Sequence, residues 1–211
     1  MDFSLNEEHL AFKEETHKFA EKEMRPKAHE YDEKNEFPME IMQKAFEAGF
    51  LTSGIPAEYG GAGFSTLINT IVCEELAWGC AGMYTSIMAN TLATTPIVLF
   101  GSDEQKKKFL TPLTEKMSFA CFALTEKEAG SDNSAIQTTA VKKGDHYVIN
   151  GSKTFITNAG VSQLGVVFAS TDRARGARGL TAFIVPMDTP GVTLGKHENK
   201  MGHRASNTAE I

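Results

Sequence analysis

The stretch PLTEKMSFACFALT, residues 112–125, lies where the apolar pattern of the chain changes. Before it, apolar residues recur at the three- and four-residue spacing of amphipathic helices. After it, short segments rich in β-branched and aromatic residues alternate with Gly, Asp, Asn and Pro, which is typical of strands joined by turns. We therefore predict an α+β fold with an all-helical domain in residues 1–113 and a β domain in residues 114–211.

Two central helices are predicted in the least charged part of the chain. Residues 66–78 and 81–100 show helical spacing with almost no charged side chains, which predicts central helices packed on several sides. Ser102 with Gln105 fits a capping box, in which each side chain satisfies a main-chain N–H at the start of a helix. That last helix is expected to reach Leu110.

Two further helices are predicted nearer the amino terminus. Residues 38–48 place apolar side chains on one face, and Gly49 is a natural terminator. Ser4 with Glu7 fits a capping box for the first helix. That helix is expected to end near Arg25-Pro26, because proline interrupts helical hydrogen bonding.

Seven short segments beyond residue 112 have strand character. Lys143-Gly144-Asp145 and Asn150-Gly151 predict hairpin turns, since these dipeptides readily adopt positive φ angles. Seven strands without helical crossovers predict an antiparallel sandwich or barrel. The expected strands are 118–125, 138–143, 146–151, 153–157, 165–171, 180–186 and 191–196.

Composition excludes several classes of protein. The chain has 211 residues, is 41% hydrophobic and carries a net charge of −6, which argues against a nucleic-acid binder or a protein of anionic membranes. It has no apolar stretch long enough to span a bilayer, and its acidic start does not fit a targeting signal, so a cytoplasmic location is predicted. The cysteines and histidines lie at no metal-ligand spacing, so no metal site is predicted.

The densest group of polar residues, 124–134, directly follows the apolar segment FACFA. Hydroxyl groups, a glycine and exposed main-chain N–H groups at the end of a strand are suited to holding a polar ring edge or a phosphate. A Ser- and Asp-rich connection that only closes two strands would have the same composition. Residue chemistry alone leaves both interpretations open.

The segment FALTEKEAGSDNSA resembles the first signature of the FAD-dependent acyl-CoA dehydrogenases. Four more segments resemble that family in the same order: IPAEYGGAG (55–63), INGSKTFITNAG (149–160), TAFIVPMDTPGV (181–192) and KMGHRASNTAE (200–210). The resemblance implies a helical domain, a central β domain and a carboxy-terminal four-helix bundle. The bundle would lie beyond Ile211, so the resemblance implies that this chain is a fragment.

The resemblance also implies an FAD site. The Thr125 hydroxyl would face the pyrimidine edge of the flavin, and Ser131 would bridge towards the pyrophosphate and the acyl-CoA. Phe155, where the family commonly has Trp, would cover the flavin, and the Thr157 hydroxyl would approach N5. The signature lacks the proline that often follows its glutamate and has Lys127 there. The residues implied to bind FAD are Phe122, Ala123, Leu124, Thr125, Gly130, Ser131, Phe155, Ile156 and Thr157.

Substrate contacts are implied for four residues. Ser131, Tyr84 and Met88 match positions that border the acyl-CoA, and Thr171 matches a position near the CoA phosphates. Ordinary core packing explains Tyr84 and Met88 equally well.

The activity implied is desaturation of an acyl-CoA thioester to a trans-2-enoyl-CoA, with electrons passed to an electron-transfer flavoprotein. A glutamate of the missing bundle would take the α-proton, so no catalytic residue is predicted here. The 211-residue chain alone is expected to be inactive, and the full-length protein to be a homotetramer. Two alternatives remain: a non-catalytic binding or assembly module of the same fold, and an acyl-CoA oxidase or enoyl-CoA reductase.

Overall fold

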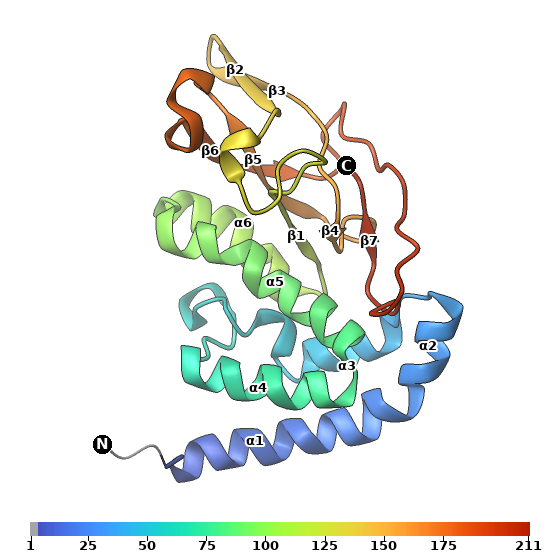
Figure 1. Ribbon diagram of the computed structural model, residues 1–211. Coiled ribbons are helices and arrows are strands. Elements are labelled where there is room, and N and C mark those ends of the chain that lie inside the picture. Colours follow the sequence, from blue (N-terminus) through green and yellow to red (C-terminus); the bar gives the residue numbers. More distant parts are fainter. Residues whose placement is uncertain (1–3) are drawn as a thin grey trace. The chain divides into compact units, whose positions relative to one another are not determined.

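The computed structural model describes residues 4–211 (Figure 1). The chain forms two compact units, a helical unit 1 and a β-rich unit 2. Unit 1 extends to Met117 and includes Asn199–Asn207, whereas unit 2 comprises Ser118–Glu198 and Thr208–Ile211. The predicted order of a helical domain followed by a β domain is confirmed. The compact units nevertheless differ from a simple division after residue 113, because a segment of the second half packs with the helices.

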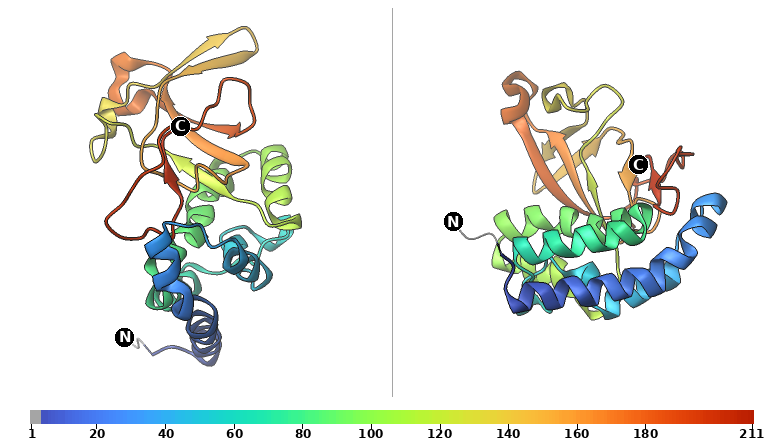
Figure 2. Two further views of the ribbon diagram at one scale, coloured as in Figure 1. Left: turned by 90° about the vertical axis from the view of Figure 1, so that its right-hand side faces the viewer. Right: turned by 60° about the horizontal axis from the view of Figure 1, so that its bottom comes forward.

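Six α-helices build unit 1 among the described residues. Helices α1 and α4 lie alongside each other, and α4 in turn contacts α5 (Figure 2). The low charge of α4 and α5 fits their central position, because both helices bury mostly apolar and small polar side chains along their length. Their bounds are α1 Glu7–Phe19, α2 Ala28–Lys34, α3 Met39–Glu47, α4 Thr66–Gly79, α5 Ala81–Phe100 and α6 Asp103–Glu115.

The start of α1 differs from the prediction. Its cap is Asn6, whose side chain accepts a hydrogen bond of 2.8 Å from the main-chain N–H of His9. The capping box predicted for Ser4 and Glu7 is therefore wrong, because the asparagine two residues later satisfies the first turn instead.

The helical path also does not end near Arg25-Pro26. After α1 it continues through a π-helical turn, Ala20–Met24, and a 3₁₀ turn, Arg25–Lys27, directly into α2. Pro26 is tolerated because it lies in the first residues of the 3₁₀ turn, where its missing N–H costs no hydrogen bond.

The predictions for the last two helices agree better with the structure. Helix α5 has the predicted bounds, and Ser102 and Gln105 form the predicted capping box of α6. Helix α6 continues past Leu110 to Glu115. Its last turn is anchored because the Thr114 hydroxyl donates to the carbonyl oxygen of Tyr59 at 2.9 Å.

Unit 2 contains a five-stranded sheet and a two-stranded sheet. The main sheet has the order β1-β5-β2-β3, with β6 paired to β5, and the small sheet pairs β4 with β7. The β2–β3, β5–β6 and β4–β7 pairs are antiparallel. Their bounds are β1 Ala120–Ala123, β2 Thr139–Lys143, β3 His146–Asn150, β4 Ile156–Thr157, β5 Leu164–Ser170, β6 Leu180–Pro186 and β7 Thr208–Ala209.

The predicted all-antiparallel pairing is wrong for the centre of the sheet. Strand β5 pairs in parallel with β1, and its end also pairs in parallel with the start of β2. A parallel pair needs a long connection. The chain between β1 and β5 provides one, because it passes through β2, β3 and β4 before it returns.

The two predicted turns have different outcomes. Gly144, at φ +65°, forms the expected hairpin turn between β2 and β3. Asn150-Gly151 forms no hairpin, since β3 and β4 belong to different sheets. Gly151 meets a steric requirement instead: a Cβ there would lie 2.1 Å from the Thr138 hydroxyl oxygen.

The predicted strand 191–196 is also absent, although these residues are all described. The segment runs irregularly beside the end of the chain. The Gly195 N–H donates to the Glu210 carbonyl at 2.8 Å, and the Glu210 N–H donates to the Lys196 carbonyl at 3.0 Å. A third bond, from the Glu198 N–H to the Thr208 carbonyl at 2.9 Å, follows, but it adds only the isolated bridge between His197 and Ala209 and no strand over 191–196.

The segment Asn199–Asn207 belongs to unit 1 through specific contacts (Figure 2). The Arg204 N–H donates to the Asp32 carboxylate at 2.8 Å, and its guanidinium donates to the Glu33 carbonyl at 3.0 Å. On α5, a Cβ at Gly82 would lie 3.2 Å from the His203 main chain. The segment is thus fixed on α2 and α5. Within residues 4–211, no helix is long and apolar enough to cross a membrane.

Candidate functional site

The first part of the candidate site follows strand β1. Ala123 is fully buried, and the next residues leave the sheet, with the Thr125 side chain half-buried. A tight turn then forms because the main chains of Glu126 and Ala129 exchange two hydrogen bonds, of 3.0 and 3.1 Å. Gly130 and Ser131 follow on the surface of unit 2.

The second part is Phe155–Thr157, in and just before strand β4. Ile156 is 1% exposed and packs in one cluster with Ala123 of β1. Phe155, by contrast, is 63% exposed although its neighbour is buried. Its φ of +58° is uncommon for a bulky side chain and costs conformational energy. The fold therefore holds an aromatic ring outward at an energetic cost, which is frequent at ligand sites.

A hydrogen bond joins these two parts. The Thr154 N–H donates to the Thr125 carbonyl oxygen at 2.9 Å. The predicted flavin-binding segments, distant in sequence, are thus neighbours in unit 2. The side-chain hydroxyls of Thr125, Ser131 and Thr157 make no hydrogen bond with any described residue.

These features are compatible with a flavin. An isoalloxazine ring requires an apolar surface against its face and hydrogen-bond donors at its polar edge. The exposed ring of Phe155 could offer the former, and the hydroxyls of Thr125 and Thr157 could act as donors. Phe122 is the last but one residue of β1, and its ring centroid lies 4.9 Å from that of Phe168.

A buried carboxylate underlies the first part of the site. Glu126 is 7% exposed and accepts hydrogen bonds from the Gln137 N–H at 2.6 Å, from the Thr138 N–H at 3.0 Å and from the Thr138 hydroxyl. Burial alone would raise the pKa of Glu126, but the Lys153 ammonium and these donors together hold that pKa below its ordinary value. The carboxylate therefore stays charged.

Lys153 is the partner of that carboxylate, and sequence reasoning did not identify it. Its side chain is 2% exposed, and its ammonium donates to Glu126 at 2.8 Å and to the Leu124 carbonyl at 2.9 Å. Burial lowers the pKa of Lys153, and the Glu126 carboxylate opposes that shift. A single lysine at the start of the predicted strand 153–157 gives no sequence signal for burial, because lysine is ordinarily exposed.

The predicted substrate residues Tyr84 and Met88 lie on α5 of unit 1, both half-buried. Burial, together with the neighbouring Cys73 thiol, raises the pKa of Tyr84. Thr171 is in unit 2 and exposed, and its hydroxyl donates to the Gly179 carbonyl at 3.1 Å.

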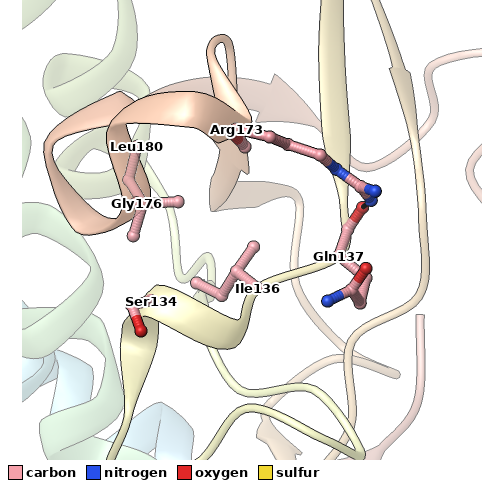
Figure 3. Close-up of a pocket in the computed structure, with 7 residues that line it drawn as sticks. Ser134, Ile136, Gln137, Arg173, Gly176 and Leu180 are labelled. Carbon is pink, nitrogen blue, oxygen red and sulfur yellow. Dashed lines mark hydrogen bonds between the residues drawn. The ribbon is translucent and has the colours of Figure 1, made fainter.

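A small polar pocket of about 170 Å³ is lined in part by Ser170 and Arg173, which are close to Thr171 in the sequence (Figure 3). Ser134, Ile136, Arg173 and Leu180 help to line it. The Arg173 guanidinium donates to the Gln137 carbonyl at 2.5 Å and so links this pocket to the segment bound by Glu126. Ser170 also lines it, and its buried hydroxyl has no hydrogen-bond partner among the described residues.

No cluster of His, Cys, Asp and Glu side chains suited to a metal ion occurs in residues 4–211. The groups described above for the candidate site are hydroxyl groups, one exposed aromatic ring and a buried ion pair.

Comparison with protein families gives two adjoining matches. Residues 6–116 match the N-terminal domain of acyl-CoA dehydrogenases, and residues 121–211 match the middle domain. The chain is 45% identical to the mitochondrial short-chain specific acyl-CoA dehydrogenase of Rattus norvegicus over 209 residues, which cover 98% of this chain and 50% of the relative. It is 44% identical to a 3-(aryl)acrylate reductase of Clostridium sporogenes, covering 98% of this chain and 55% of that protein.

Solved structures agree with these matches. Butyryl-CoA dehydrogenase from Megasphaera elsdenii superposes with a TM-score of 0.92 at 40% identity, covering 100% of this chain and 56% of that one. An acyl-CoA dehydrogenase of Bacillus anthracis solved with FAD has a TM-score of 0.83 at 32% identity, covering 98% and 35%. The chain thus spans about half the length of the curated relatives it matches.

Proposed function

We propose that this chain, which belongs to the acyl-CoA dehydrogenase family, supplies the flavin-binding part and one wall of the acyl-CoA site of an FAD-dependent acyl-CoA dehydrogenase. The reaction is the α,β-desaturation of an acyl-CoA thioester to a trans-2-enoyl-CoA. A short, straight acyl chain is the proposed substrate, because the rat relative is named as short-chain specific.

One observation carries the proposal. Thr125 and the segment Phe155–Thr157 are held together by the Thr154–Thr125 hydrogen bond, with hydroxyls that no described residue uses and a ring that is exposed. This arrangement supports the flavin contacts that the family resemblance implies for the same residues.

Bound FAD would supply the hydride acceptor for the substrate Cβ. The protein residues would contribute binding and orientation: the exposed Phe155 ring would cover the flavin, the Thr125 hydroxyl would donate towards the pyrimidine edge, and the Thr157 hydroxyl would donate towards N5. Fixed donors at an edge that gains negative charge stabilise the transition state more than the ground state.

The two buried carboxylates of the described residues are both paired. Glu75 accepts from His17 at 2.7 Å and lies 3.5 Å from the Lys13 ammonium. Glu126 is bound by Lys153, Thr138 and Gln137. Neither is free to take the substrate α-proton, so the proposed base belongs to the carboxy-terminal region that the relatives possess.

The test uses the full-length protein, that is, this chain continued by a carboxy-terminal region of the kind its relatives have. We expect it to purify with FAD, and butyryl-CoA to bleach the flavin absorbance. A protein that binds FAD but is not reduced by any acyl-CoA would contradict the dehydrogenase proposal. The 211-residue chain alone is expected to give no turnover.

A reductase is the second candidate, favoured by the 44% identity to the 3-(aryl)acrylate reductase. The same flavin site would then deliver hydride to an activated double bond. The two directions are distinguished by supplying chemically reduced enzyme with an enoate or enoyl thioester and comparing the rate of reoxidation with the rate of reduction by the saturated thioester.

Three further properties belong to the same proposal. An electron-transfer flavoprotein is the proposed electron partner, a homotetramer the proposed assembly of the full-length protein, and the cytoplasm the proposed location. The non-catalytic module remains the alternative if the full-length protein binds neither FAD nor acyl-CoA.

A further inference from the structure

Lys153 occupies an unusual position for a lysine. Its side chain is 2% exposed, and its ammonium has two acceptors, the Leu124 carbonyl at 2.9 Å and the Glu126 carboxylate at 2.8 Å. These acceptors belong to the residues immediately before and after Thr125. The ammonium thus holds both flanks of the residue whose hydroxyl is proposed to contact the flavin.

The carboxylate extends this restraint across the loop. Glu126 accepts the main-chain N–H groups of Gln137 and Thr138, at 2.6 and 3.0 Å, and the Thr138 hydroxyl. One carboxylate therefore joins the loop after β1 to the two residues immediately before β2, closing the loop that contains Ser131. Lys153 neutralises that carboxylate from within the protein.

The main chain of Lys153 connects a third segment. Its N–H donates to the Ile211 carbonyl at 2.8 Å, and the Ile211 N–H donates back at 2.9 Å. The next residue, Thr154, donates to the Thr125 carbonyl at 2.9 Å and precedes Phe155. Lys153 is therefore the one described residue that is bonded directly to both the Thr125 loop and the chain after β7, and it adjoins Phe155 in the sequence.

We propose that Lys153 is a positioning residue that, through Leu124 and Glu126, sets the orientation of Thr125 and the loop to Ser131 for flavin binding. The inference rests on the proposed flavin site. Net stabilisation of the fold does not explain the arrangement equally well, because a buried ion pair contributes little net stability relative to apolar residues of similar volume. What the Lys153–Glu126 ion pair does specifically is to fix the geometry of the main chain around Thr125.

The test compares Lys153→Met with Lys143→Met in the full-length protein. Methionine keeps the length and apolar volume of the stem but lacks the ammonium, and Lys143 is an exposed lysine on β2. The readouts are amide hydrogen exchange of the apoprotein, FAD affinity and the midpoint potential of the bound flavin. Hydrogen exchange needs no cofactor, so it tests whether Lys153 restrains the loop even if the wild-type protein fails to bind FAD. Failure of the wild-type protein to bind FAD would contradict the proposed function instead.

For Lys153→Met we expect faster exchange at the Gln137 and Thr138 amides than elsewhere in unit 2. FAD binding should weaken about tenfold, as for loss of one charge-assisted hydrogen bond, and the flavin potential should shift. Lys143→Met should match wild type in all three. An unchanged FAD affinity and potential, or a uniform rise in exchange across unit 2, would show that Lys153 is merely structural and would overturn the proposal.

A second variant covers the case in which Lys153→Met does not fold. Glu126→Gln keeps the side-chain shape and one acceptor for the ammonium, but it turns an N–H donor towards the Gln137 N–H. It is expected to weaken FAD binding by a smaller factor, with faster exchange confined to the same two amides. Wild-type exchange and wild-type FAD affinity in Glu126→Gln would count against the proposal.

Discussion

The Thr154 N–H donates a 2.9 Å hydrogen bond to the carbonyl oxygen of Thr125, and so joins the loop after β1 to the segment that enters β4. Thr125 and Phe155 thereby become parts of one surface although they are thirty positions apart in the sequence. The expected effects of substitution follow from how each residue around this bond is buried and paired.

Substitutions at Phe155 should separate the effect of backbone strain on stability from the effect of the ring on FAD binding. Its side chain is exposed, but its φ is +58°, which glycine adopts without the penalty that alanine pays. We expect Phe155→Gly to be about 1 kcal/mol more stable than Phe155→Ala in urea unfolding. Both should bind FAD more weakly than wild type, because both lack the ring. Equal stability of the two variants would refute the strain, and unchanged FAD affinity would refute the stacking role.

Two buried hydroxyls of unit 2 should respond in opposite ways. Ser170 has no hydrogen-bond partner for its hydroxyl among the described residues, whereas the Thr138 hydroxyl donates to Glu126. Ser170→Ala is expected to leave the free energy of unfolding unchanged or raise it by up to about 1 kcal/mol. Thr138→Val, which keeps the shape, should lower it by about 1–3 kcal/mol. Thermal and urea unfolding measure both, and a clear loss for Ser170→Ala would reveal a partner for that hydroxyl.

Gly151 should tolerate no side chain. A Cβ there would lie 2.1 Å from the Thr138 hydroxyl oxygen and 2.7 Å from the Thr138 Cα, so the backbone must shift. We expect Gly151→Ala to cost about 1–3 kcal/mol of unfolding free energy. Gly130→Ala is the matched control, because nothing lies within 4 Å of a Cβ at that position. Similar stability of the two variants would mean that the close approach is relieved at little cost.

Acid should weaken unit 2 partly through Glu126. Its pKa lies below the ordinary value of 4.5, so its charged form is favoured by folding. That contribution is fully present above about pH 4.5 and is lost as the pH falls through the lower pKa of the folded state. We expect the melting temperature of Glu126→Gln to fall less between pH 5 and about pH 3 than that of wild type, since glutamine does not titrate. Parallel decreases for the two proteins would contradict this.

Local signals account for the parts of the fold that the sequence predicts. The bounds of α5, the Ser102–Gln105 cap and the Gly144 turn each depend on a few neighbouring residues. Competition between nearby signals explains the two wrong predictions for the first helix. Asn6, and not Ser4, caps its first turn, and a 3₁₀ turn accommodates Pro26 without ending the helical path.

Long-range pairing accounts for the rest. The parallel pairing of β5 with β1 and the packing of Asn199–Asn207 on α2 and α5 depend on where distant segments return, which no local spacing encodes. For the site, a family resemblance indicates Thr125 and Phe155, but only the structure reveals Lys153, because burial of a lysine depends on a carboxylate elsewhere in the chain.

The most direct measurement is FAD binding by the full-length protein, followed by titration of wild type, Thr125→Val and Phe155→Ala with the cofactor. The predicted result is a yellow wild-type protein whose flavin is reduced by butyryl-CoA, and weaker FAD binding in both variants. A colourless full-length protein that takes up no added FAD would contradict the assignment of this surface to a flavin.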